Sequence, residues 1–137
     1  MRILALGVLF SLLALSARAQ EIGGTTNLTR DPGHGTQIEY LSPEGRAFLW
    51  YPGNRDILPG VWEMQGDKLC FAYGENTYNP VTGHQGGSFE CAPLDFYFKY
   101  LSERAKGDVF GLETRRRVPF DLTSKDVSLQ DVVDALQ

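Results

Sequence analysis

The chain has 137 residues, of which 22% are charged, and a formal net charge of −4 at pH 7. This length corresponds to one domain, and such a domain can bury a core without depending on disulfides or metals. The acidic balance argues against binding to nucleic acid or to anionic lipid, because both reward clustered Lys and Arg side chains.

The first residues have the pattern of a secretory signal peptide. Arg2 precedes an apolar run over residues 3–15, and a small-x-small cleavage site follows at residues 17–19. The run is too short to span a bilayer core, so we expect no stable membrane insertion. The sequence therefore predicts a signal peptide over residues 1–19 and a mature protein that is periplasmic or secreted.

The next segment, residues 20–35, lacks any apolar period and contains four glycines and Pro32. Such composition is typical of a flexible N-terminal arm. We expect a single disulfide-tied, β-rich domain to follow over residues 36–137.

Alternation of polar and apolar residues predicts two hairpins. The first joins strands over residues 36–41 and 46–51 through a Ser-Pro-Glu-Gly turn. The second joins strands over residues 61–65 and 68–73, and the Pro59-Gly60 pair before it is expected to end a loop. The side chains expected in the core are Trp62, Met64, Leu69, Phe71 and Tyr73.

Cys70 and Cys91 are the only cysteines, and in an exported chain an even count predicts a disulfide. Their spacing matches neither a Cys-x-x-Cys redox motif nor a pair of zinc ligands. They flank a long polar loop over residues 74–87, which the bridge would tie to the scaffold. A strand is expected over residues 88–92.

The C-terminal third contains the helical signals. Residues 94–105 fit a helix through an apolar stripe and a strand through their aromatic content, and we favour the helix. Short strands are expected over 108–112 and 117–122, and a capping-box pattern at Ser128 predicts a terminal helix. The expected fold class is α+β: an antiparallel β meander or small partly closed barrel with one or two short C-terminal helices.

The string Asp31-Pro32-Gly33-His34-Gly35 resembles the zinc-binding motif of N-acetylmuramoyl-L-alanine amidases. The resemblance implies that His34 binds zinc, which would polarise a water molecule, with His84 as a second ligand. The carboxylate of such a site would come from one of three glutamates, Glu39, Glu63 and Glu90. A zinc-dependent cell-wall amidase is therefore one alternative function.

A broader segment, residues 36–92, resembles a group of small exported bacterial β-domain proteins of unknown function. The matching features are Pro43-Glu44-Gly45-Arg46, Gly60 followed by Trp62, Asp67-Lys68-Leu69-Cys70-Phe71 and the later Cys91. This resemblance implies a compact β domain with a disulfide and no particular activity.

Amphipathic side chains beside loops predict a binding surface that includes Tyr51, Tyr78 and His84. We expect a non-enzymatic binding protein without a cofactor, whose partner is an envelope or extracellular protein, which it binds or inhibits, or a cell-wall component. A carrier of a small apolar ligand is a further alternative. Large aromatic side chains argue against that carrier, because they would fill the interior of a small barrel.

Overall fold

The computed structural model describes residues 21–33, 35–74, 78–79 and 84–137. The predicted signal peptide over residues 1–19 lies outside these ranges. Within them, no helix has both the length and the apolar character that crossing a membrane requires.

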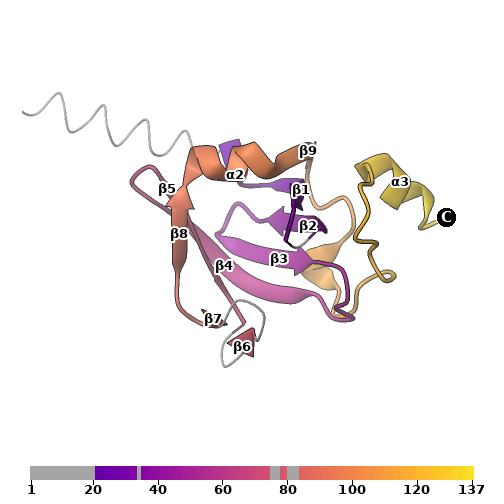
Figure 1. Ribbon diagram of the computed structural model, residues 1–137, viewed down its shortest axis with the longest axis horizontal. Helices are drawn as coiled ribbons and strands as arrows, with labels where there is room; N and C mark the ends of the chain where they lie inside the picture. Colours follow the sequence, from indigo (N-terminus) through magenta and orange to yellow (C-terminus); the bar gives the residue numbers. More distant parts are fainter. Residues whose placement is uncertain (1–20, 34, 75–77, 80–83) are drawn as a thin grey trace, which may run out of the picture.

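A seven-stranded antiparallel sheet, curled like half a barrel, forms the body of the protein (Figure 1). Its strand order is β8-β5-β4-β3-β2-β1-β9, and β6 and β7 pair in a separate ribbon. The strands are β1 (Thr25–Asp31), β2 (Gly35–Leu41), β3 (Arg46–Trp50), β4 (Leu58–Gln65), β5 (Lys68–Tyr73), β6 (Tyr78–Asn79), β7 (His84–Gln85), β8 (Glu90–Pro93) and β9 (Leu101–Lys106). The predicted antiparallel β architecture is confirmed, and the helix content is small.

Both predicted hairpins are present. In the first, β2 pairs with β3, and the Gly45 N–H donates to the Ser42 carbonyl at 3.2 Å to close the turn. Gly45 has a φ of 86°, a conformation that glycine adopts without steric cost. In the second hairpin β4 pairs with β5 across Gly66, whose φ of 65° has the same requirement.

β4 begins earlier than expected, so that Pro59 and Gly60 lie inside the strand and not in a loop. Gly60 pairs with Tyr73, and a Cβ added to Gly60 would lie 2.6 Å from the Tyr73 ring. The missing side chain therefore leaves room for the tyrosine ring to lie over β4. Glycine at this position reflects a close approach within the sheet, which local turn statistics do not distinguish from a loop.

The N-terminal segment differs most from its prediction as a flexible arm over residues 20–35. β1 lies between β2 and β9 in the sheet, and Leu28 is fully buried. Thr26 and Asn27 are also fully buried, and the Thr26 hydroxyl donates to the Gly107 carbonyl at 2.6 Å. Hydrogen bonds satisfy these polar groups, so a strand forms without apolar alternation. The β-rich domain thus begins before residue 36.

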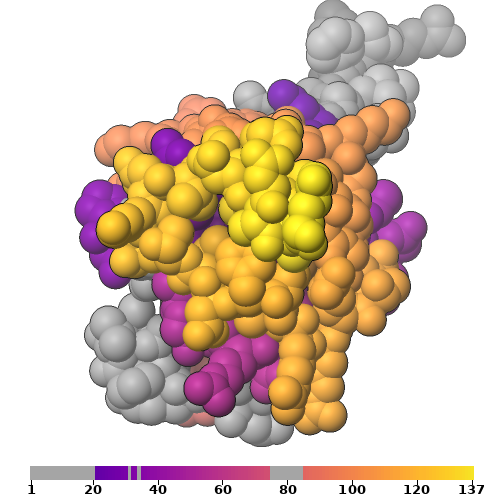
Figure 2. All heavy atoms as spheres, turned by 90° about the vertical axis from the view of Figure 1, so that its right-hand side faces the viewer, coloured from indigo at the N-terminus to yellow at the C-terminus, as the bar shows by residue number. Residues whose placement is uncertain are grey.

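Apolar side chains cover both faces of the sheet. On one face the C-terminal segment packs against β1, β2 and β3 (Figure 1), and Figure 2 shows its orange-to-yellow atoms spread over that side of the molecule. On the other face lies α2 (Leu94–Tyr100) with a second cluster. All five side chains expected in the core belong to this second cluster; Trp62 and Leu69 are buried, and Met64, Phe71 and Tyr73 are partly buried.

The segment over residues 94–105 forms a helix and then a strand, because α2 ends at Tyr100 and β9 follows directly. The strands predicted over 108–112 and 117–122 do not form. Those residues instead contain the short 3-10 helix η1 (Leu112–Thr114) and irregular chain with one bridge, between Asp56 and Arg117. Their apolar side chains pack onto the face of the sheet, and this packing replaces strand pairing at its edge.

The terminal helix α3 (Leu129–Asp134) begins as predicted with a capping box. The Asp131 N–H donates to the Ser128 hydroxyl oxygen at 3.0 Å, and the Ser128 N–H donates to the Asp131 carboxylate at 2.8 Å. These two bonds satisfy N–H groups that a short helix would otherwise leave without partners.

Trp50 holds the C-terminal segment on the sheet, since it is fully buried and packs edge-on against Phe110 at 5.8 Å and Phe120 at 5.1 Å. We expect Trp50→Ala to lower the free energy of unfolding by about 3–5 kcal/mol, through lost contacts and a cavity. Urea denaturation measures this change. Leu136→Ala, at a side chain that is 42% exposed, is the control and should cost less than about 1 kcal/mol. Similar losses in the two variants would contradict the packing role.

Candidate functional site

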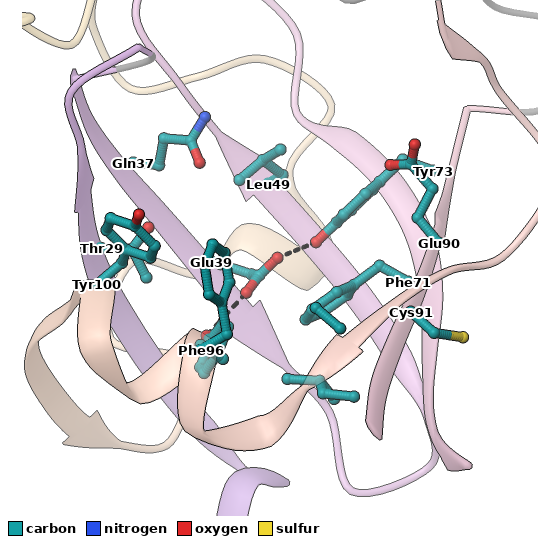
Figure 3. A pocket seen from close by; sticks show the side chains of 13 residues that line it. Thr29, Gln37, Glu39, Leu49, Phe71, Tyr73, Glu90, Cys91, Phe96 and Tyr100 are labelled. Atoms are coloured by element: carbon teal, nitrogen blue, oxygen red, sulfur yellow. Dashed lines mark hydrogen bonds between the residues drawn. The ribbon is translucent and has the colours of Figure 1, made fainter. Parts of the chain in front are cut away.

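A pocket with a volume of about 340 Å³ lies on the α2 side of the sheet. Side chains from β1, β2, β3, β5 and β8 form one part of its wall and α2 forms another (Figure 3). Its lining includes two carboxylic acids, Glu39 and Glu90, and the five aromatic residues Phe71, Tyr73, Phe96, Tyr97 and Tyr100. Pockets of this size and mixed lining are typical of small-molecule sites.

Alternation along β2 places a polar face on the pocket. Gln37 and Glu39 line it, whereas Ile38 and Tyr40 belong to the core on the opposite face. Glu39 pairs with Leu49 of β3, which also lines the pocket. The carboxyl group of Glu39 is nevertheless enclosed, because this residue is only 6% exposed.

The Tyr73 hydroxyl donates a hydrogen bond to one oxygen of the Glu39 carboxyl group, drawn as a dashed line in Figure 3. Three strand spacings separate β5 from β2, which corresponds to roughly 14 Å in a flat sheet. The curl of the sheet and the missing side chain at Gly60 bring the two groups together. The bond therefore depends on the half-barrel shape.

The Tyr97 hydroxyl donates to the other oxygen of Glu39 at 2.9 Å. Tyr97 belongs to α2, so the two tyrosines link Glu39 to the far strand of the sheet and to the helix above it. Each carboxyl oxygen can accept a second hydrogen bond. The network is thus connected within the protein and still has capacity for a ligand.

Burial raises the pKa of Glu39 to about 7, although the hydrogen bonds from Tyr73 and Tyr97 act in the lowering direction. Burial of their hydroxyl groups raises the pKa values of Tyr73 and Tyr97 well above 10, and the Glu39 charge adds to both shifts. Both tyrosines therefore remain donors at neutral pH, while Glu39 changes its charge there. A carboxyl group with such a pKa in a pocket is a candidate functional group.

The predicted disulfide is confirmed. Cys70 and Cys91 are register partners across β5 and β8, and their sulfur atoms lie 2.00 Å apart. Cys91 also lines the pocket. The bridge therefore holds the β8 wall of the pocket against the sheet, a role that the cysteine count alone does not predict.

Of the three binding residues predicted from the sequence, only Tyr51 has a described side chain that can be compared with this pocket. Tyr51 is half-buried after β3 and does not line the pocket. The backbones of Tyr78 and His84 belong to the β6–β7 ribbon, but their side chains lie outside the described structure. Binding by these three residues stays a prediction.

The zinc hypothesis also stays a prediction, because His34 lies outside the described residues and only the backbone of His84 is described. Where the chain is described, no three His, Cys, Asp or Glu side chains form a group that could hold a metal ion. Glu39, one of three glutamates considered as a zinc ligand from the sequence, accepts hydrogen bonds from two tyrosines.

Sequence reasoning missed the site because its members have local patterns that indicate other roles. Glu39 alternates with apolar neighbours as a solvent-facing strand residue would, Tyr73 fits a core position, and Tyr97 was not singled out.

Comparison of the chain with protein-family models, curated proteins and solved structures gave no match. The site is therefore interpreted from its own geometry.

We expect Glu39→Gln to change the pH dependence of stability. An acid with a raised pKa in the folded state binds its proton more tightly there than in the unfolded chain. Its contribution to stability is complete below pH 4.5 and is lost as the pH rises to about 7. That loss amounts to about 3 kcal/mol. Glutamine does not ionise, so the variant does not lose this contribution. Its free energy of unfolding should therefore rise relative to that of the wild type between pH 4.5 and pH 8.

Urea denaturation of both proteins across this pH range measures the difference. Glu63→Gln is the matched control, because Glu63 is exposed on β4. The control should follow the wild type closely. If the stability of Glu39→Gln also has the same pH dependence as that of the wild type, Glu39 does not bury an ionisable carboxyl group.

Proposed function

We propose that this protein is an exported binding protein that holds a small amphipathic molecule in the pocket between the sheet and α2. The observation that carries the proposal is the enclosed carboxyl group of Glu39, held between Tyr73 and Tyr97 at a pocket with aromatic walls. Apolar walls with few, well-placed polar groups are typical of ligand pockets.

The chemistry of the lining supports binding over catalysis. Among the described residues that line the pocket, none is Ser, His, Lys or Arg, and the two tyrosine hydroxyl groups beside Glu39 have pKa values raised well above 10, so they stay protonated. Both oxygens of Glu39 are oriented by tyrosine hydroxyl groups. An oriented carboxyl group with spare acceptor capacity is suited to recognising a polar group of a ligand.

Two features support export. The N-terminal pattern predicts a signal peptide, and the Cys70–Cys91 disulfide is compatible with an oxidising compartment.

The aromatic side chains, which were expected to fill the interior, leave the pocket open and line it. This favours a small ligand over the protein partner predicted from the surface of Tyr51, Tyr78 and His84.

Ala92→Trp tests the proposal, because Ala92 lines the pocket and a tryptophan there would occupy its volume. We expect compounds from a library of small amphipathic amines, alcohols and acids to raise the melting temperature of the wild type, because they bind only the folded state. The same compounds should have little effect on Ala92→Trp.

Ala135→Trp, at an exposed position after α3, is the control and should respond as the wild type does. Equal thermal shifts in Ala92→Trp and the wild type would show that the compounds bind elsewhere. A library without any active compound would count against the proposed function.

A further inference from the structure

Ionised Glu39 has no counter-charge in the described lining of the pocket. That lining contains no cationic side chain. The hydrogen-bond partners that the structure shows for Glu39 are two neutral hydroxyl groups. When Glu39 ionises, these partners solvate its charge without neutralising it, and an enclosed charge without a counter-charge is costly.

Two cationic side chains of β9 and α2 make contacts outside the pocket lining. Arg104 donates to the Glu21 carbonyl at 3.1 Å, and its guanidinium group lies 5.3 Å from the Phe98 ring centre. Lys99 lies 5.6 Å from the centre of the Tyr100 ring. Neither side chain lines the pocket, so the described lining supplies no counter-charge for ionised Glu39, and a cationic ligand would supply one.

Aromatic rings approach the same space from two elements. Phe71 stacks on Tyr73 along β5 with a centroid distance of 5.8 Å and also contacts Tyr97 of α2 at 6.0 Å. On α2, Phe96 and Tyr100 pack edge-to-face at 5.0 Å. The faces of such rings attract cations, most strongly where water is excluded.

The exposure of Phe96 indicates an apolar part of the ligand. This side chain lines the pocket although it is 52% exposed. The hydrocarbon part of a bound molecule would cover its ring, while a positively charged end would reach Glu39. An anionic ligand would instead meet the Glu39 carboxyl group, and a neutral one would supply no charge to pair with its ionised form.

We propose that the ligand of this pocket is a small organic cation, an amine with an apolar body, whose ammonium group pairs with Glu39 among the aromatic rings. This inference rests on the proposed function, because it names the chemical class of the molecule that the pocket holds. Tyr73 and Tyr97 orient the carboxylate, and ring faces of β5 and α2 surround the bound charge.

The pairing makes binding pH-dependent. The groups around Glu39 are the hydroxyls of Tyr73 on β5 and Tyr97 on α2, with Glu90 of β8 also at the pocket and Arg104 of β9 acting on Tyr97. Only ionised Glu39 pairs with an ammonium group. Since the pKa of Glu39 is about 7 without a ligand, affinity for an amine should fall roughly tenfold for each pH unit below 7.

Three probes of similar shape test the inference: 3-phenylpropylamine, 3-phenylpropanol and 3-phenylpropanoate. Binding is followed by nuclear magnetic resonance titration of the mature protein at pH 8 and pH 6. At pH 8 we expect the amine to bind at least tenfold more tightly than the alcohol, and the acid to bind most weakly. At pH 6 the advantage of the amine over the alcohol should shrink about tenfold.

Glu39→Gln keeps the size of the side chain and removes its charge. It should abolish the preference for the amine and its pH dependence, while the alcohol still binds. Glu63→Gln, at an exposed position, should leave all three affinities unchanged. These comparisons separate the charge of Glu39 from the acidity of the whole protein.

The outcomes separate the two proposals. If the alcohol or the acid binds as tightly as the amine and Ala92→Trp weakens that binding, the pocket binds small molecules but the cation inference is overturned. If none of the probes binds, or if Ala92→Trp binds all three unchanged, the proposed function fails together with the inference. An amine preference that Glu39→Gln retains also overturns the inference.

Discussion

The enclosed carboxyl group of Glu39 is the interaction on which the pocket side of this molecule depends. Tyr73 of β5 and Tyr97 of α2 donate to its two oxygens. The Glu39 side chain thus connects β2 to β5, which is not its neighbour in the sheet, and to the helix α2. In a low-dielectric environment, removal of one donor would leave a polar group without its partner. The curl of the sheet, the glycine at position 60 and the placement of α2 all serve this contact.

The two faces of the sheet satisfy different requirements. The face under the C-terminal segment is a conventional apolar core centred on Trp50, with edge-to-face aromatic contacts. The face under α2 encloses an ionisable group, although an apolar side chain there would cost less. Such a departure from the most stable solution is expected where a protein binds something. The disulfide at the edge of this face holds the strand that closes the pocket.

Several parts of the fold were predictable because their signals are local. The turn at residues 42–45, the glycine turn at residue 66 and the capping box at Ser128 each depend on residues within one turn of the chain. β1 was not predictable in this way. Its buried Thr26 and Asn27 are tolerated through hydrogen bonds, including one from Thr26 to residue 107, which is 81 positions away. Local polarity therefore indicated an arm where the tertiary structure has an interior strand.

The sequence by itself determined the two hairpins, the cysteine pairing and the terminal helix, because turn residues, composition and capping specify them without reference to distant elements. Only the tertiary structure decided the site. Glu39 lies 34 residues from Tyr73 and 58 residues from Tyr97, and nothing local distinguishes a glutamate facing a pocket from one facing water. The curl of the sheet and the position of α2 make that distinction, because they bring the three side chains together and remove the carboxyl group from solvent.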